Sequence, residues 1–144
     1  MKIEMKQDLS LKDEIEVTVR YTRYDPIVKK LEILIRSADK TVKCSHEQEE
    51  LWLNASDIYY VESIDKRTFI YGETTVYSSE QRLYQLMDEL RTFGFVQVSK
   101  SCIININKLK SIKPLINSKM EATLSSGERI DVTRKYIKGI RMML

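Results

Sequence analysis

Three short basic segments hold the side chains of this 144-residue sequence that are best suited to chemistry with a charged partner. They are Lys66-Arg67, Ser99-Lys100-Ser101 and Arg134-Lys135. The second segment places a lysine between two hydroxyl groups, a combination that suits phosphate oxygens or base edges. In the third, the arginine can donate two hydrogen bonds to one guanine edge, while the lysine can serve a phosphate as a point charge. These residue types favour binding of nucleic acid over catalysis.

Metal and catalytic centres are disfavoured because the sequence has few residues that could build them. His46 is the single histidine, and Cys44 and Cys102 are the only cysteines, too few for a disulfide framework or a four-cysteine zinc site. There is no glycine-rich phosphate loop and no C-x-x-C, H-E-x-x-H or G-x-S-x-G motif. We therefore expect no metal, no cofactor, no small-molecule substrate and no enzymatic activity. Two isolated thiols also suit a reducing cytoplasm.

The charge of the chain is divided unevenly along its length. Residues 99–144 carry 10 Lys or Arg against 3 Asp or Glu, whereas residues 1–98 carry 14 against 18, so a modest net charge of +3 hides a basic C-terminal third. Such asymmetry points to nucleic acid or an anionic surface, although a solvated face with counterions would also account for it. No long apolar run is present, so we expect neither a membrane span nor a signal peptide.

The basic segments need a scaffold, and the sequence from residue 51 onward predicts one of short strands. Runs rich in β-branched and aromatic residues predict strands near 51–53, 57–64, 68–71, 74–77, 95–98, 102–106, 112–116, 120–124 and 128–133. Ser78 and Gln81 suggest a capping box for one main helix that buries Leu83, Leu86, Met87 and Leu90. A short helix is expected at 136–144. This pattern predicts an α+β, mostly β fold with the basic segments in loops.

The first 45 residues follow a different pattern. Strict alternation over 14–21, with Ile15 and Tyr21 on the apolar face, predicts a half-buried strand. Asp25-Pro26 then begins a helix that runs to about Ser37, with an apolar stripe of Ile27, Leu31, Leu34 and Ile35. We expect residues 1–45 to form a strand–helix accessory unit docked on a domain of residues 46–144. This unit is a candidate for dimerisation or inhibitor docking, or it simply covers a sheet edge.

Two long stretches of the sequence resemble the LytTR family of bacterial DNA-binding domains. They run from Phe95 to Ile112 (FVQVSKSCIININKLKSI) and from Leu124 to Tyr136 (LSSGERIDVTRKY). The segment Asp57–Glu62 resembles the family's early strand, and the helix near 83–90 falls where the family has its helix. The resemblance covers about residues 45–144, and the order and spacing of the segments agree throughout.

The resemblance implies an elongated arrangement of small antiparallel sheets that reads double-stranded DNA with loops instead of a recognition helix. It implies three DNA-binding loops, which contain Lys66 and Arg67, then Ser99, Lys100 and Ser101, and finally Arg134 and Lys135. Asn105 matches a recurring family asparagine that we interpret as structural. Many relatives have Arg at Gln97 and His at Ser99, and these departures bring the sequence closer to a subgroup with a V-x-I-S-K-S-like segment. Members of that subgroup are short stand-alone regulators without a receiver domain, often encoded beside a small membrane protein that restrains them.

The leading prediction is a sequence-specific transcription regulator of bacterial type that binds promoter repeats in duplex DNA. It acts in the cytoplasm, as a homodimer at least on DNA. The alternative is a protein-interaction module that uses its basic surface to bind an acidic or membrane-bound partner.

Overall fold

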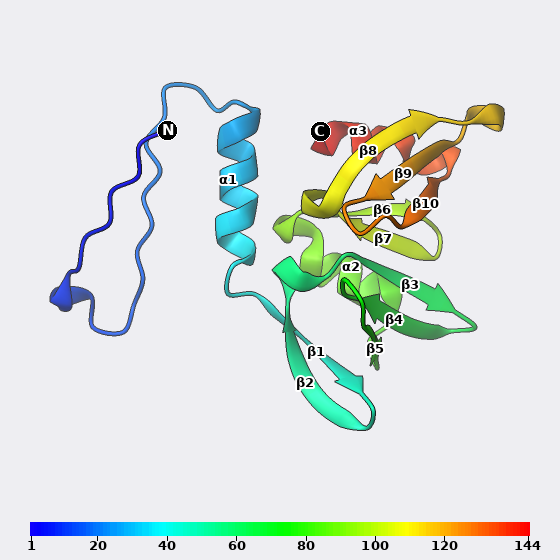
Figure 1. Ribbon diagram of the computed structural model, residues 1–144, viewed down its shortest axis with the longest axis horizontal. Helices are drawn as coiled ribbons and strands as arrows, with labels where there is room; N and C mark the ends of the chain where they lie inside the picture. Colours follow the sequence, from blue (N-terminus) through cyan, green and yellow to red (C-terminus); the bar gives the residue numbers. More distant parts are fainter.

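The protein is described by a computed structural model of residues 1–144, in which two antiparallel sheets are accompanied by three α-helices (Figure 1). The first sheet has seven strands in the spatial order β2-β1-β5-β4-β3-β7-β6. Their bounds are β1 Thr41–His46, β2 Glu49–Asn54, β3 Tyr60–Ile64, β4 Arg67–Tyr71, β5 Val76–Ser79, β6 Phe95–Ser99 and β7 Cys102–Asn105. The second sheet has the order β10-β9-β8, with β8 at Leu109–Pro114, β9 at Met120–Leu124 and β10 at Arg129–Val132. The predicted α+β, mostly β fold of antiparallel sheets is confirmed.

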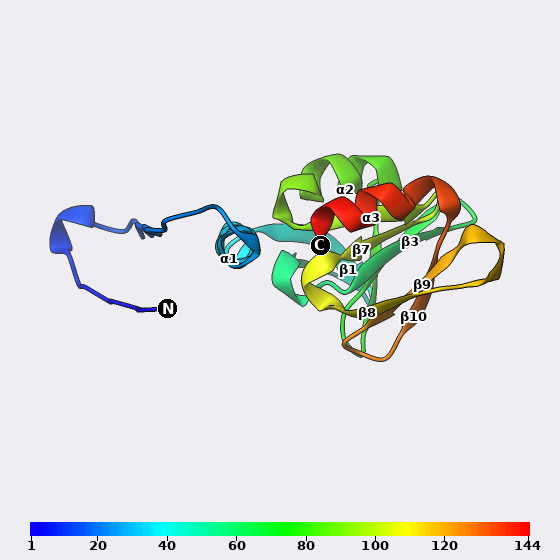
Figure 2. The same cartoon turned by 90° about the horizontal axis from the view of Figure 1, so that it is seen from above.

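Helices α2 and α3 lie on one side of the central strands and the second sheet lies on the other, while α1 stands beside them (Figure 2). Helix α2, Leu83–Leu90, buries the four residues predicted for it, Leu83, Leu86, Met87 and Leu90. Their core also contains Val61 and Ile70 from the middle of the first sheet. Helix α3, Ile137–Met143, places Ile140 in a second core with residues from β6, β7, β9 and β10. The molecule therefore has two adjoining cores, one beneath each of these helices.

The start of α2 differs from the prediction. Ser78 lies in β5, where it faces Phe69 of β4 and Ser45 of β1, so it cannot cap a helix. The helix begins at Leu83, five residues later, and the Gln85 side chain accepts a hydrogen bond of 2.7 Å from the Arg82 backbone N–H. The predicted capping box of Ser78 and Gln81 is therefore wrong, because strand pairing continues to Ser79.

Strand β1 was not among the predicted elements, and it crosses the expected boundary at residue 45. It forms a six-residue ladder with β2 and a single rung, Ser45↔Ser78, with β5. The first sheet therefore continues across residue 45, because β1 includes residues on both sides of it. The division into functional units of residues 1–45 and 46–144 stays a prediction.

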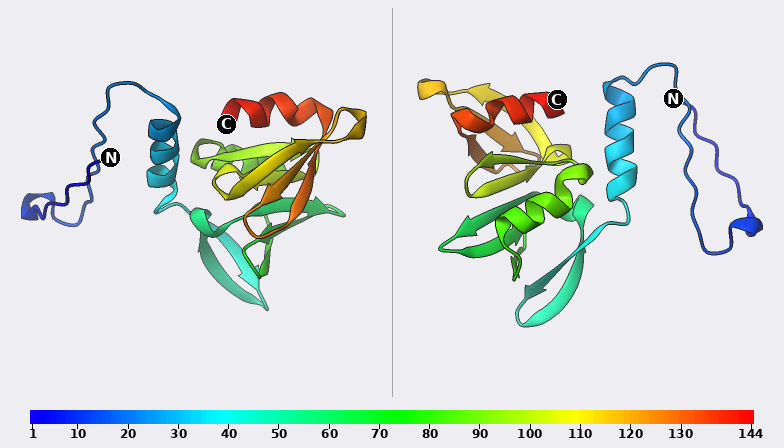
Figure 3. Two further views of the ribbon diagram at one scale, coloured as in Figure 1. Left: turned by 45° about the horizontal axis from the view of Figure 1, so that its top comes forward. Right: turned by 180° about the vertical axis from the view of Figure 1, so that it is seen from behind.

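The predicted strand at residues 14–21 is wrong. No strand is formed there, and the side chains expected on the buried face are exposed, with Ile15 at 91% and Tyr21 at 56%. A strand needs a neighbour to satisfy its backbone N–H and C=O groups, and this segment has none. Residues 1–25, which include one 3-10 turn at Leu9–Leu11, instead form an arm that stands away from the body (Figures 1 and 3).

Helix α1, Pro26–Ser37, begins as predicted, since the Asp25 carboxylate accepts a hydrogen bond of 3.0 Å from the Val28 backbone N–H. Its orientation differs from the expectation. Ser37 is buried and Ile33 faces Gly94, whereas the predicted stripe is largely uncovered: Ile27 is 60% exposed, and Leu34 and Ile35 are 39% and 36% exposed. The helix docks through a face beside its apolar stripe, so most of the stripe remains in contact with solvent.

Candidate nucleic-acid interface

The first basic segment forms the tip of the β3–β4 hairpin. Asp65 and Lys66 have φ values of 51° and 65°, which is the left-handed pair required by a type I′ turn. Arg67 begins β4 opposite Ile64, and both Lys66 and Arg67 are exposed. The tight turn leaves Lys66 at the tip of the hairpin beside Asp65, and Arg67 follows it in the first pair of the ladder.

The second segment is the β6–β7 turn, which is shaped by its own polar side chains. The Ser99 hydroxyl accepts a hydrogen bond of 3.2 Å from the Ser101 backbone N–H. The Gln97 side-chain amide donates to the Ser99 carbonyl at 2.9 Å, beside a register shift in the β6–β7 ladder. Lys100 and Ser101 are exposed at the tip. Gln97 and Ser99, the two departures from the common family pattern, thus stabilise the turn that presents Lys100.

The third segment, Arg134–Tyr136, is a 3-10 turn between β10 and α3. The Thr133 backbone N–H donates a hydrogen bond of 2.9 Å to the Val98 carbonyl, which holds the start of this turn against β6. Arg134 and Lys135 are exposed, and the Lys135 ammonium lies 5.7 Å from the centre of the Tyr136 ring. The turn is therefore fixed to the strand that leads into the second segment.

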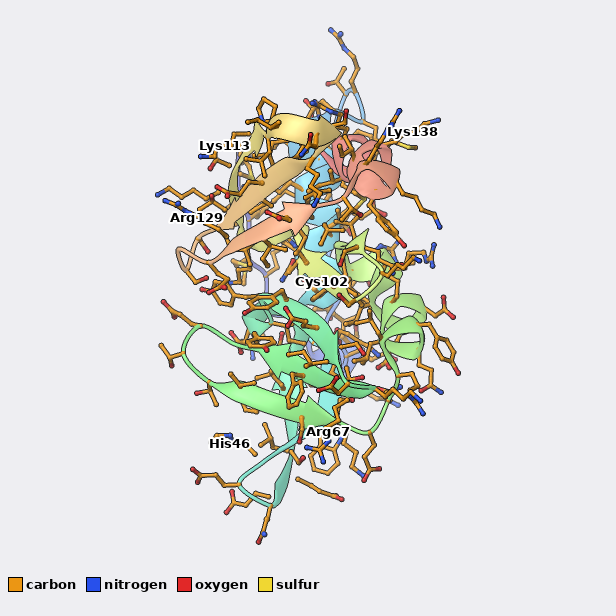
Figure 4. The ribbon with its side chains drawn as sticks, turned by 90° about the vertical axis from the view of Figure 1, so that its right-hand side faces the viewer. His46, Arg67, Cys102, Lys113, Arg129 and Lys138 are labelled. Atoms are coloured by element: carbon orange, nitrogen blue, oxygen red, sulfur yellow. The ribbon has the colours of Figure 1, made fainter.

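Two backbone hydrogen bonds connect all three segments. Besides the bond from Thr133 to Val98, the Ser63 backbone N–H donates to the Ser101 carbonyl at 2.8 Å, which joins the first hairpin to the second turn. The three segments consequently lie along one edge of the molecule, at the right of Figure 1, and this edge faces the viewer in Figure 4. A common binding surface requires these loops to lie on one side of the molecule, and the pairing of their strands places them there.

Further cations on this side were not singled out by sequence reasoning. Figure 4 shows Arg67 in the lower half of this face and Arg129, Lys113 and Lys138 in the upper half. Of these, Lys113 is paired with Glu121 at 3.6 Å. The basic character of residues 99–144 was the signal that pointed to them. The sequence could not show which of the cations in residues 99–144 face this side, because that depends on the register of the strands and on the position of α3.

The cations of the three loops have no carboxylate partners. The ion pairs within 4.0 Å involve other residues, and none includes Lys66, Arg67, Lys100, Arg134 or Lys135. Several acidic side chains are instead gathered at the exposed end of the β1–β2 hairpin, which contains Glu47, Glu49 and Glu50. The positive charge of the loops is thus available to an external anion.

Two residues behind the loops are structural. Asn105 is 1% exposed, donates a hydrogen bond of 2.9 Å to the Ile58 carbonyl and accepts one of 3.0 Å from the Asn107 backbone N–H. Cys102 is the buried first residue of β7, two positions after Lys100, and burial raises the pKa of its thiol to about 12, with a smaller contribution from the charge of Glu62. Asn105 therefore supports the strand from within the core, as predicted, and Cys102 remains a neutral thiol.

No group of three or more His, Cys, Asp or Glu side chains is arranged to hold a metal ion. None of the three helices has both the length and the apolar composition needed to span a bilayer.

Comparison with known proteins gives the same family over most of the chain. The model of the LytTr DNA-binding domain matches residues 48–144. The sensory transduction protein LytT of Bacillus cereus is 28% identical over 115 residues, covering 76% of this chain and 47% of that protein. The transcriptional regulatory protein YpdB of Escherichia coli is 27% identical over 90 residues, covering 62% of this chain and 37% of that protein. The chain thus spans about half the length, or less, of these relatives.

A solved structure shares the fold. The LytTr DNA-binding domain of a methyl-accepting/DNA response regulator from Bacillus cereus superposes with a TM-score of 0.68 at 24% identity, covering 73% of this chain and 96% of that one. The family model, the relatives and the shared fold all agree with the resemblance to the LytTR family that was found in residues 45–144. This chain belongs to the LytTR family of DNA-binding domains.

Proposed function

We propose that this protein is a sequence-specific transcription regulator of bacterial type that reads the major grooves of duplex DNA through its three basic loops. The observation that carries the proposal is the joining of these loops along one edge by two backbone hydrogen bonds, from Ser63 to Ser101 and from Thr133 to Val98. Loops held to one another in this way can meet one side of a double helix together. Membership of a family of DNA-binding domains supports the same ligand.

Each loop has a distinct role in this proposal. Arg134 donates two hydrogen bonds to a guanine edge, because its guanidinium is exposed and has no carboxylate partner. Lys100 and Lys135 bind phosphates, and Lys66 and Arg67 enter the first groove. The Ser101 hydroxyl serves a phosphate oxygen, whereas Ser99, whose hydroxyl already accepts from the Ser101 N–H, acts by shaping the turn.

The remaining parts of the proposal concern partners and location. We propose that two protomers bind a repeated promoter site, and that the protein acts in the cytoplasm, where bacterial DNA lies. A small membrane protein that restrains the regulator is proposed by analogy with the stand-alone subgroup. The proposal includes no catalytic step, no cofactor and no small-molecule substrate.

Selection from a random oligonucleotide pool with the purified full chain, followed by sequencing, tests the proposal. We expect a repeated consensus sequence, bound about 10³-fold or more tightly than random duplex at physiological salt. A pool that remains random through repeated rounds would contradict sequence-specific binding. It would favour the alternative of a module that binds an acidic or membrane-bound protein through the same cations.

A further inference from the structure

We infer that the N-terminal arm, residues 14–21, of one copy of this protein packs into a groove beside α1 of a second copy. This inference concerns self-association in the absence of DNA, and it goes beyond the proposed regulator function by naming the surface and its occupant. Exposed hydrophobic side chains are concentrated in the N-terminal part of the chain. Of the 19 large hydrophobic side chains that are exposed in the molecule, 12 lie within residues 1–35. A monomeric protein seldom leaves such a concentration uncovered.

The groove lies between α1 and the segments beside it from the C-terminal half of the chain. Its volume is about 480 Å³, and its apolar lining includes Ile27, Ile33, Ile106, Leu109 and Met143. Two cations of α1, Lys29 and Lys30, also line it. Lys29 donates a hydrogen bond of 3.0 Å to the Met142 carbonyl, and Lys30 is exposed without a carboxylate partner. The groove therefore combines apolar side chains with the two lysines of α1, which line it together with Asp25 and the C-terminal Leu144.

The arm has the complementary pattern. Residues 14–21 alternate strictly, so in an extended conformation Ile15, Val17, Val19 and Tyr21 share one face. Glu14 and Glu16 lie on the opposite face at the N-terminal end of this segment. Placed in the groove, the apolar face would meet the floor and the two carboxylates would approach Lys29 and Lys30. At about 3.3 Å per residue in a strand against 1.5 Å in a helix, the eight residues are long enough to follow the whole of α1.

A second copy is the occupant that fits the geometry of the arm. The chain bends at residues 22–23, where the Asp25 backbone N–H donates to the Arg23 carbonyl at 2.9 Å, and this bend directs the arm away from its own body. Tyr24 and Asp25 themselves line the groove. In all views the arm projects beyond α1 on the side opposite the body (Figures 1, 2 and 3). Exchange of identical arms between two copies buries both apolar faces at once and forms a closed, symmetric pair.

The exchange also forms the same apolar contact twice. Each protomer places the four apolar side chains of its arm, Ile15, Val17, Val19 and Tyr21, in the partner's groove and receives the partner's four in its own. The surface lies at the left of Figure 1, away from the basic loops at the right, so a partner bound there leaves those loops open.

Sedimentation velocity of the full chain without DNA provides the first test. We expect a dimer at about 100 µM, and we expect the double variant Ile15→Glu/Val17→Glu to raise its dissociation constant by at least about tenfold. Ile116→Glu is the matched control, because Ile116 is 87% exposed but lies outside the N-terminal surface, and it should leave the constant unchanged. A monomeric wild-type chain, or a dimer insensitive to the arm variant, would overturn the inference. Since DNA is absent, neither result bears on the proposed regulator function.

A charge-reversal experiment distinguishes exchange between copies from folding back within one copy. The variants Glu14→Lys/Glu16→Lys and Lys29→Glu/Lys30→Glu should each dimerise more weakly than the wild type because like charges meet in both interfaces. An equimolar mixture should form heterodimers, since each arm then meets a groove of opposite charge. If mixing produces no association beyond that of the separate variants, the arm does not occupy the groove of a second copy.

Discussion

The Ser63 backbone N–H donates a hydrogen bond of 2.8 Å to the Ser101 carbonyl oxygen, immediately beyond the last pair of the β3–β7 ladder, Glu62↔Cys102. This bond extends the contact between the two strands up to the turns that follow them. As a result, Lys66 and Lys100 lie in the turns of two hairpins whose strands β3 and β7 are paired. Because the loops are held together in this way, the effect of replacing individual side chains in them can be predicted.

Replacement of Arg134 by Ala should reduce affinity for the selected duplex by about 1–3 kcal/mol and relax the preference at one base pair, because a bidentate contact to one base is lost. Fluorescence anisotropy with the selected duplex, its single-base variants and random DNA would measure both effects. Arg91→Ala removes an exposed arginine outside the three loops and serves as the control. An equal loss on random DNA would exclude base reading by Arg134.

Replacement of Lys100 or Lys135 by Ala should weaken binding to all duplexes by similar factors. Each contact to a phosphate releases counterions, so the slope of log affinity against log salt should fall by about one for each lysine removed. Titrations at several salt concentrations would report the slope. Lys43→Ala, on β1 outside the basic loops, should leave it unchanged. An unaltered slope in the Lys100 variant would assign that side chain another role.

Replacement of Gly94 by Ala should destabilise the fold by more than the same change at Gly127. Both glycines have left-handed backbones, with φ of 88° and 94°, so each alanine carries a conformational cost of roughly 1–2 kcal/mol. At Gly94 the new Cβ would also lie 2.6 Å from Cγ2 of Ile33 on α1, whereas the space at Gly127 is open. Urea denaturation of the two variants would compare their free energies of unfolding. Equal losses would indicate that α1 does not rest against Gly94.

The buried thiol of Cys102 should make the protein less stable in alkali. Burial raises its pKa from 9.0 to about 12, so the neutral form is favoured in the folded state. This contribution to stability is complete below about pH 9 and is lost as the pH rises from there towards about 12. Urea denaturation at about pH 8 and about pH 10.5 should therefore show a smaller decrease for Cys102→Ala than for the wild type. An identical decrease in both proteins would contradict this account.

Local sequence patterns alone determined much of this protein. The capping aspartate and proline at the start of α1, the four buried residues of α2, and the strands around the three basic turns depend on interactions between residues close in the chain. The concentration of positive charge after residue 98 also follows from the sequence directly. These features are sufficient to predict the fold class, the family and the basic loops from the sequence.

Tertiary structure decided which alternating segments became strands and which loops met. Thr41–His46 is a strand because β2 and β5 satisfy its backbone, whereas residues 14–21, with a clearer alternating pattern, have no neighbour and remain an arm. The bonds from Ser63 to Ser101 and from Thr133 to Val98 join residues that are more than thirty positions apart. A strand forms only where a neighbouring strand satisfies its backbone N–H and C=O groups. Which segment becomes that neighbour depends on the packing of the whole chain, so a local sequence pattern cannot predict it.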